Sequence, residues 1–421
     1  MRRSVVLSAV AIVAAAGSAV YVASSASAAV ACSAAWSSSA VYTNGMSASQ
    51  NSHNYTAKWW TQNESPATHS GQWDVWADNG ACDGGTTPPT TKPPTTPPTT
   101  TPPPTTPPPT TPPPTTPPPS NGTLPAHVVT GYWHNFDNPA NEIKLAAVPT
   151  TYDLVAVSFA DATSTPGAVT FSIDPGLAAS VGGYTNDQFK ADVATLHARG
   201  KKVIISVGGE RGAVAVGDAT AATNFANSVW SLMQTYGFDG VDIDLENGLN
   251  PTYMAQALRS LRTKAGSSLI ITMAPQTIDM QNPAGSYFKL ALDIKDILTI
   301  VHTQFYNSGA MLGCDQNAAY GQGTVNFIVA LACIQLEAGL RPDQVAIGLP
   351  ATPSAAGGGY VSPSVVNQAL DCLARGTNCG SFKPPRTYPG LRGAMTWSIN
   401  WDVTAGNGWA NAVSPHVHAL P

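Results

Sequence analysis

The sequence predicts a mixed α/β protein with a (β/α)8 barrel in its C-terminal part and a small β-rich module in its N-terminal part. Three observations lead to this prediction. Residues 124–421 hold eight apolar, β-branched runs that alternate with amphipathic helical patterns. Residues 86–119 are Thr and Pro apart from Lys92, and such a segment cannot bury a core. The segment before it is rich in aromatic residues and nearly free of helical periodicity.

Eight candidate strands follow one another in the C-terminal part. They lie at 127–133, 152–160, 201–209, 238–246, 269–276, 298–307, 344–351 and 392–400. Most are continuous apolar runs, which are typical of a parallel sheet covered on both faces. Eight alternations of strand and helix predict a closed barrel. An open, doubly wound sheet is the alternative, but no G-x-G-x-x-G motif follows the first strand.

Amphipathic helices separate these strands. Residues 186–199 place Phe189, Val193 and Leu196 on one stripe, and Gly200 follows as a stop signal. A second helix is expected from about Ala221 to Tyr236.

The first 28 residues have the pattern of a secretory signal peptide. Two arginines precede an apolar run, and Ala26-Ser27-Ala28 is a suitable cleavage site. A membrane anchor is the alternative, but Ser and Gly interrupt the run. We expect a secreted, extracellular protein with no membrane partner.

Charge and cysteine content narrow the chemistry further. A net charge of −5 argues against nucleic acid as a partner. Six cysteines in a secreted chain suggest three disulfides, and chain proximity favours Cys32–Cys82, Cys314–Cys333 and Cys372–Cys379 among 15 possible connectivities. Zinc is the alternative, but no C-x-x-C or H-E-x-x-H spacing occurs. We expect no metal and no cofactor.

The Thr/Pro segment, with its flanks, forms a linker over residues 86–123. Proline favours an extended polyproline conformation, so the segment would reach about 100 Å when extended. The linker is predicted to tether the N-terminal module, residues 32–85, to the barrel, residues 124–421.

The N-terminal module carries more large aromatic residues than a core of its size can hide. They are Trp36, Tyr42, Tyr55, Trp59, Trp60, Trp73 and Trp76. Some are expected to be exposed as flat surfaces suited to stacking on sugar rings. For Trp73 and Trp76, core packing is an equal alternative.

The stretch Asp239-Gly-Val-Asp-Ile-Asp-Leu-Glu246 alternates acidic with apolar residues. In a strand, Asp242, Asp244 and Glu246 point to one side. If the apolar residues face the helices, the acids face the barrel axis, where packing cannot explain them. The row ends on the C-terminal rim, where barrel enzymes place their chemistry. Crowded acids share protons, so Glu246 is expected to act as a general acid.

The row also resembles a family motif. D-x-x-D-x-D-x-E is the signature of glycoside hydrolase family 18, and all four acidic positions match. Further similarities are Ser206-Val-Gly-Gly209, Met273-Ala-Pro-Gln276, Gln304-Phe-Tyr-Asn307, Gly131-Tyr-Trp133 and Trp397. The resemblance covers the whole barrel. Many members have Tyr-Asp on the sixth strand, whereas this chain has Tyr306-Asn307.

The resemblance implies a retaining, substrate-assisted cleavage of β-1,4 bonds in chitin. Glu246 would protonate the glycosidic oxygen, Asp244 and Tyr306 would steady the 2-acetamido group, and Asp242 would share a proton with Asp244. The resemblance also implies a cis peptide at Trp397–Ser398. The implied cleft residues are Tyr132, Trp133, Gly208, Gly209, Met273, Gln276, Gln304, Asn307 and Trp397. For Met273, barrel packing is the alternative.

The N-terminal module resembles the chitin- and cellulose-binding modules of carbohydrate-binding families 5 and 12. The similarity lies in Tyr55-Thr-Ala-Lys-Trp-Trp-Thr-Gln62, in Trp36 and in the later Trp-Asp-Val-Trp. It implies that Trp36, Trp59 and Trp60 face a crystalline polysaccharide. The expected partners are chitin and N-acetylglucosamine oligomers, and the expected state is a monomer.

Three other functions are weighed against a chitinase. The first is an inactive chitin-binding lectin, which usually lacks the acid that Glu246 supplies. The second is an endo-acting glycosidase of glycoproteins, and a chitin-type module argues against it. The third is a cellulase, and the acidic motif argues against it.

About 40 residues separate the last two strands, too few for an extra α+β domain. The cleft is therefore expected to be open, with non-processive endo action.

Overall fold

The computed structural model describes residues 30–42, 45–58, 61–62, 64–70, 75–83 and 123–421. The chain divides into two compact units, Met1–Pro109 and Thr110–Pro421. Several predicted features lie outside the described residues. They are the expected signal peptide, residues 84–85 of the predicted module, residues 86–122 of the predicted linker, and Trp59, Trp60 and Trp73.

The N-terminal unit is a small β structure. Its strands are β1 (Val41–Tyr42), β2 (Ser47–Gln50), β3 (His53–Ala57), β4 (Thr61–Gln62) and β5 (Trp76–Ala81). Strands β2, β3 and β5 form one antiparallel sheet, and β1 pairs with β4. Trp76 is buried in the core against Tyr42, and its Nε1 donates to the Glu64 carbonyl at 2.9 Å. The β-rich prediction is confirmed, and Trp76 serves packing.

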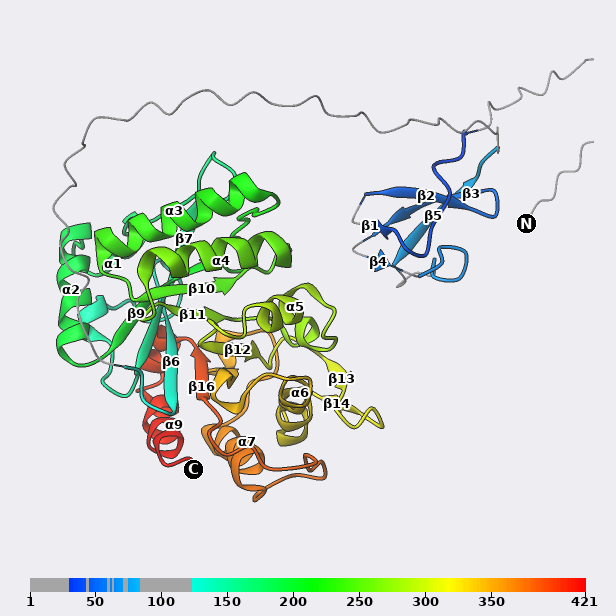
Figure 1. Cartoon of the computed structure of the whole chain (residues 1–421). Coiled ribbons are helices and arrows are strands. Elements are labelled where there is room, and N and C mark those ends of the chain that lie inside the picture. The colour runs from blue at the N-terminus through cyan, green and yellow to red at the C-terminus, as the bar shows by residue number, and fades with distance from the viewer. Residues whose placement is uncertain (1–29, 43–44, 59–60, 63, 71–74, 84–122) are drawn as a thin grey trace, which may run out of the picture. The chain divides into compact units, whose positions relative to one another are not determined.

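Eight parallel strands of the C-terminal unit close into a barrel (Figure 1). They are β6 (Val128–His134), β7 (Leu154–Ala162), β9 (Lys202–Gly208), β10 (Gly240–Asp244), β11 (Ile270–Met273), β12 (Ile300–Gln304), β15 (Val345–Pro350) and β16 (Gly393–Trp397). Strand β6 pairs with both β16 and β7, which completes the closure. Each strand overlaps the run predicted for it, so the (β/α)8 fold is confirmed and the open sheet is excluded.

The C-terminal unit has three further short strands besides the eight of the barrel. They are β8 (Val169–Thr170), which pairs with the end of β7, and the hairpin of β13 (Ala310–Leu312) with β14 (Ala319–Gly321).

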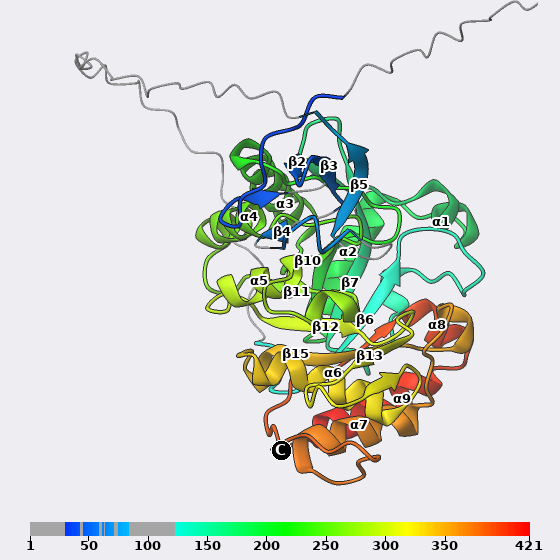
Figure 2. The same ribbon diagram turned by 90° about the vertical axis from the view of Figure 1, so that its right-hand side faces the viewer.

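Helices surround the barrel, and neighbours such as α3 and α4, or α6 and α7, lie side by side (Figures 1 and 2). The α-helices are α1 (Pro175–Ser180), α2 (Asn186–Ala198), α3 (Ala219–Tyr236), α4 (Pro251–Ala265), α5 (Ser286–Asp293), α6 (Val325–Glu337), α7 (Pro363–Arg375), α8 (Ile399–Thr404) and α9 (Gly408–His418). The 3₁₀ helices are η1 (Leu145–Ala147), η2 (Thr277–Met280), η3 (Pro342–Gln344) and η4 (Pro353–Ala355).

Local side chains set the helix ends. Helix α3 starts two residues before its predicted beginning because the Asp218 carboxylate accepts from the Ala221 backbone N–H at 2.8 Å. It ends at Gly237, which adopts φ = 81°. Helix α2 begins with a capping box between Thr185 and Gln188.

Two apolar layers show which way each strand faces. Val241, Ile243 and Leu245 pack in the layer between strands and helices. A separate inner layer fills the barrel, and Leu124 and Trp397 pack against it. Alternate residues of β10 therefore face the barrel axis, as the sequence predicted.

The segment between β15 and β16 is described throughout. Residues 351–392 contain only η4 and α7 as regular elements. The expectation that no α+β domain is inserted here is confirmed.

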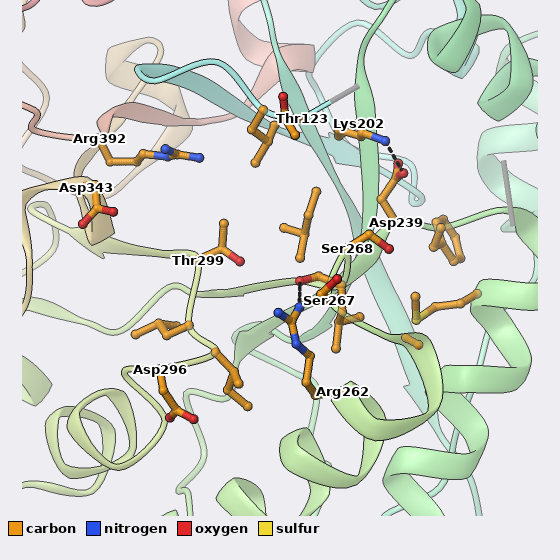
Figure 3. A pocket seen from close by; sticks show the side chains of 18 of the residues that line it. Thr123, Lys202, Asp239, Arg262, Ser267, Ser268, Asp296, Thr299, Asp343 and Arg392 are labelled. Carbon is orange, nitrogen blue, oxygen red and sulfur yellow. Dashed lines mark hydrogen bonds and ion pairs between the residues drawn. The ribbon is translucent and has the colours of Figure 1, made fainter. Parts of the chain in front are cut away.

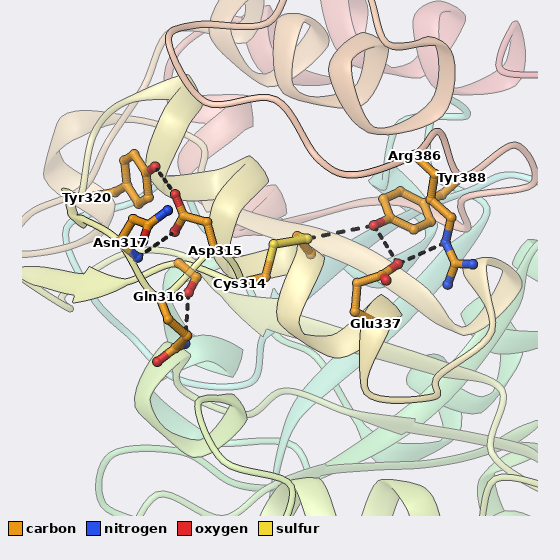
Figure 4. Close-up of a disulfide and its surroundings, with 10 residues drawn as sticks. Cys314, Asp315, Gln316, Asn317, Tyr320, Glu337, Arg386 and Tyr388 are labelled. Atoms are coloured by element: carbon orange, nitrogen blue, oxygen red, sulfur yellow. Dashed lines mark hydrogen bonds and ion pairs between the residues drawn. A yellow bond between two sulfur atoms is a disulfide. The ribbon is translucent and has the colours of Figure 1, made fainter.

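The three expected disulfides are Cys32–Cys82, Cys314–Cys333 and Cys372–Cys379. Cys314 follows β13 and Cys333 lies in α6, so their bond ties the hairpin to the barrel (Figure 4). Beside it, Tyr388 donates to the Glu337 carboxylate at 2.8 Å.

A cavity of about 610 Å³ lies at the N-terminal ends of the strands (Figure 3). Its Lys202 and Asp239 form an ion pair at 2.9 Å, and its Arg262 donates to the Leu269 carbonyl. None of the three carboxylates of the acidic row lines it.

Within the described part of the chain, no helix has both the length and the apolar character needed to cross a bilayer. The same residues contain no group of three or more His, Cys, Asp or Glu side chains arranged to hold a metal ion.

Candidate active site

Strand β10 carries the acidic row between two parallel neighbours. In the register of the sheet, Asp242 lies opposite Ser206 of β9 and Thr272 of β11. Because residues in register on parallel strands point to the same side, these hydroxyl groups face the same interior as the carboxylate.

Asp242 lies at the bottom of the row and is fully buried. Its Oδ2 accepts hydrogen bonds from Tyr132 Oη at 2.8 Å and Ser206 Oγ at 2.7 Å. Its Oδ1 accepts from Thr272 Oγ1 at 2.6 Å. Burial raises the pKa of Asp242, and the three hydroxyl donors work against that rise. The donors hold the carboxyl group in one orientation.

Asp244 is the middle acid and is only 4% exposed. It accepts a hydrogen bond from Gln304 Nε2 at 3.0 Å. Burial, followed by the charges of Asp242 and Glu246, raises the pKa of Asp244 well above its usual range. Among the described residues, no Lys, Arg or His forms an ion pair with any of the three acids. A proton shared within the row is the way to reduce the repulsion.

Glu246 is half-buried at the top of the row. The side-chain amides of Gln276 and Gln304 donate to its carboxylate oxygens, at 3.5 Å and 3.4 Å. These contacts are long for hydrogen bonds, so they orient the carboxyl group without occupying it fully. Glu246 is the member of the row that is free to reach a bound molecule.

Two glycines allow β9 to approach the end of β10. A Cβ on Gly208, which has φ = 124°, would lie 2.1 Å from the Asp244 carbonyl oxygen. The Gly209 N–H donates to that same oxygen at 2.7 Å. A Cβ on Gly209 would lie 2.7 Å from the ring of Phe159. The Gly-Gly pair is thus required by close backbone contact.

A cavity of about 1200 Å³ opens above the acidic row at the C-terminal ends of the strands. Nine residues expected at the site line it. They are Gly208, Gly209, Asp244, Glu246, Gln276, Gln304, Tyr306, Asn307 and Trp397. Burial, with the nearby charges of Asp244 and Glu246, raises the pKa of Tyr306 well above its usual range, so its hydroxyl remains a donor. The cavity thus places one accessible acid among buried acids, amides and aromatic rings.

Three residues expected at the cleft, and Asp242, lie elsewhere. Tyr132 lies below the cleft, buried against Trp397 and bonded to Asp242. Trp133 is fully buried on the helix side of β6, where its Nε1 donates to the Ile143 carbonyl at 2.9 Å. Met273 is buried on the helix side of β11, so the packing alternative applies to it. The alternation of strand side chains separates these residues from the cleft.

Other cleft residues were not singled out from the sequence. Phe136 and Phe159 line the cavity and stack near Trp397, with ring centroids 6.4 Å and 6.0 Å from it. The peptide Trp397–Ser398 is cis, as expected, and Ser158–Phe159 is also cis. Phe136 follows β6, and Phe159 lies near the C-terminal end of β7. Because barrel enzymes place their chemistry at the C-terminal ends of strands, this position was the signal in the sequence that could have identified them.

Asp279 of η2 was also missed. Its Oδ2 accepts from the Gln276 backbone N–H at 3.0 Å. An acid three residues after a cleft amide, at the start of a short helix, is a recognisable capping pattern.

In the N-terminal unit, the structure describes one of the three tryptophans expected on a sugar-binding surface. Trp36 is partly buried and packs against the module core. Trp59 and Trp60 are outside the described residues.

This chain is similar to a known protein family and to several known proteins. The model of the glycosyl hydrolases family 18 matches residues 128–410. A relative named Chitinase D, from Niallia circulans, is 39% identical over 329 residues, which are 69% of this chain and 61% of that protein. The chain thus spans less than two thirds of that relative.

Two solved structures are similar to this chain. A crystal structure of a candidate chitinase A from Streptomyces coelicolor is 68% identical with a TM-score of 0.68, and the match covers 70% of this chain and 99% of that one. A family 18 chitinase from Chromobacterium violaceum is 30% identical with a TM-score of 0.64, and the match covers 91% of this chain and 99% of that one.

Proposed function

Because this chain belongs to the glycosyl hydrolases of family 18, we propose that it is a secreted chitinase that cuts β-1,4 bonds of chitin with retention of configuration. The observation that carries the proposal is the row Asp242, Asp244 and Glu246, in which two buried acids lie beneath one accessible acid. The names of the relatives support chitin as the substrate class.

Glu246 is the proposed general acid and base. It lies at the cleft with only long contacts to Gln276 and Gln304, so its proton is available to a glycosidic oxygen. Proton transfer to that oxygen breaks the bond from C1 to the leaving sugar. Glu246 then takes a proton from the water that attacks C1.

Asp244 is poorly suited to attack C1 as a second carboxylate. Burial and like charges raise its pKa, so it exists as a protonated or proton-sharing group. We propose that the 2-acetamido oxygen of the substrate attacks C1 instead and forms an oxazolinium ion, which is the known exception to the two-carboxylate scheme. Asp244 accepts a hydrogen bond from the acetamido N–H, and the charge it gains offsets the positive ring. Asp242, held by three hydroxyl donors, takes up the shared proton.

Tyr306 and Trp397 complete the proposed sugar site. The Tyr306 hydroxyl stays protonated and donates to the acetamido oxygen. The Trp397 ring packs near the rings of Tyr132, Phe136 and Phe159, and it forms a flat floor for one sugar.

Hydrolysis of colloidal chitin by the full chain tests the proposal, with a high-mannose glycoprotein as the competing substrate. Glu246→Gln is expected to lower turnover by about 10² to 10⁴, because the amide has no proton to give. The matched control is Glu210→Gln, which alters an exposed carboxyl group in the same cleft. Glycan release without chitin turnover, or a Glu246→Gln variant with more than about a tenth of wild-type rate, contradicts the proposal.

We further propose endo, non-processive cutting. With η4 and α7 alone between β15 and β16, no inserted domain walls the cleft on that side. The viscosity of a soluble chitin derivative is expected to fall early, relative to the release of reducing ends. Dominant dimer release at nearly constant viscosity contradicts this mode.

A further inference from the structure

The cleft contains a second tryptophan besides Trp397. Trp401 lines the same cavity and is partly exposed. Four other rings lie within 6.4 Å of the Trp397 ring centroid, whereas no ring among the described residues stacks on Trp401. Part of the Trp401 side chain packs against the apolar layer outside the strands. The rest borders the cleft, where it is open to a ligand.

Helix α8 holds Trp401 between two fully buried polar residues, Asn400 and Asp402. The side chain of Asn400 donates to the Asn141 carbonyl at 3.0 Å. The carboxylate of Asp402 accepts from Tyr152 Oη at 2.7 Å. The backbone at Trp401 is therefore fixed on both sides, and a ring that is already fixed loses little freedom when it binds a ligand.

Trp401 lies at the end of the cleft that α8 forms with the loop after β6. Asn141 of this loop donates its backbone N–H to Thr404 Oγ1 at 2.7 Å, which ties the loop to α8. The same loop brings Phe136 and Asp137 to the cleft. The Asp137 carboxylate is exposed and can accept hydrogen bonds from hydroxyl groups. This end of the cleft thus offers aromatic rings and a polar acceptor, the two kinds of group that suit a sugar.

The closed barrel sets the direction in which a bound chain reaches Trp401. Strand β16 lies four strands from β10 in either direction around the barrel, so α8 and Glu246 lie on opposite sides of the cleft. In the proposed mechanism, the sugar above Trp397 turns its C1 toward Glu246, so its O4 points to the opposite side. The next sugar on the O4 side then lies toward α8.

We propose that Trp401 is a substrate-binding residue that stacks on a second sugar, on the non-reducing side of the sugar above Trp397. The inference rests on the proposed chitin substrate and deepens it, because two adjacent sugars are then recognised by tryptophan rings of the cleft.

Turnover of the para-nitrophenyl glycoside of the N-acetylglucosamine disaccharide tests this role, because its two sugars reach both tryptophans while nitrophenol leaves. Trp401→Leu keeps apolar bulk and removes the flat ring, so kcat/KM is expected to fall about three- to ten-fold, mainly through a higher KM. Trp401→Phe keeps a ring and is expected to stay within about two-fold of wild type. The control Trp230→Leu removes a partly exposed tryptophan at the other end of the barrel and leaves kcat/KM unchanged.

Fluorine NMR of the full chain, labelled with fluorotryptophan and carrying Glu246→Gln, reads binding without turnover. The chain has 10 tryptophans, and Trp401→Phe identifies the resonance of Trp401. That resonance is expected to move when the free disaccharide is added, while the resonance of Trp230 stays in place. A ring that serves only to pack against the core gives no such shift.

The outcomes separate this inference from the proposed function. A kcat/KM of Trp401→Leu within about two-fold of wild type, at a retained melting temperature, overturns the inference. An equal loss in Trp401→Phe also overturns it, because stacking on a ring is then not the cause. If Trp401→Leu does not fold, the NMR decides alone, and an unmoved Trp401 resonance at saturating disaccharide overturns the inference. Failure of the wild type on chitin overturns the proposed function, while the resonance still shows whether a sugar binds at Trp401.

Discussion

Asp244 is buried beside two other carboxyl groups, and this position has an energetic cost that depends on pH. Its pKa is raised, so the folded state holds this proton more tightly than the unfolded chain does. The stabilisation is fully present below the unfolded value near pH 4, and it is lost as the pH rises through the folded value. At neutral and alkaline pH, Asp244 therefore opposes folding.

Asp244→Asn is predicted to stabilise the barrel at alkaline pH while it reduces chitin hydrolysis. The amide cannot ionise, yet its oxygen still accepts from Gln304. Thermal unfolding at pH 8 is expected to show a melting temperature about 2–5 °C above wild type, with a smaller or absent gain at pH 4. Asp187→Asn is the control. A gain that is larger at pH 4 than at pH 8 contradicts the burial argument.

At the scale of elements, the ends of β9 and β10 are in backbone contact. The approach depends on Gly208, because any side chain there would enter the space of the Asp244 carbonyl. Packed backbone cannot move aside as a flexible side chain can.

Gly208→Ala is predicted to destabilise the barrel by about 3 kcal/mol or more and to reduce activity, because the new Cβ forces β9 away from β10. Denaturant unfolding and chitin-oligomer turnover measure the two effects. Gly217→Ala is the matched control, since a Cβ there meets nothing within 4 Å and Gly217 has no positive φ. Equal stability of the two variants would show that the strands separate easily.

At the scale of the whole molecule, the two units are predicted to divide binding from chemistry. The disulfide Cys32–Cys82 joins positions 50 residues apart and encloses the small N-terminal unit. Closing a loop of that size contributes about 4 kcal/mol in the chain-entropy model, which a small core needs. The unit can therefore fold as a separate module.

Removal of residues 30–122 is predicted to lower the rate on insoluble chitin several-fold and to leave soluble oligomers almost unaffected. A tethered module raises the local concentration of the enzyme at a surface without touching the cleft. The double variant Trp59→Ala with Trp60→Ala tests the same role in the full chain. It is expected to show the same lower rate on insoluble chitin. A comparable loss on a soluble tetramer contradicts the division of labour.

The sequence by itself determined the barrel, the acidic row and the side it faces. Eight β-branched runs separated by helical patterns leave few other packings, because each strand must bury both faces. The alternation in β10 predicted that Val241, Ile243 and Leu245 face the helices, which the structure confirms. The acids between them therefore had to face the barrel axis. The continuous apolar runs and the period-two alternation in β10 are both local patterns, so they can be read without coordinates.

Only the tertiary structure decided which neighbouring residues share the cleft. Trp133 and Tyr132 are adjacent in sequence, yet Trp133 packs against the helices and Tyr132 holds Asp242. Phe136 and Phe159 lie at the ends of two different strands, β6 and β7, and they meet beside Trp397 of β16 only because the barrel closes. Contacts between distant segments depend on register and closure, and no local pattern in the chain encodes them.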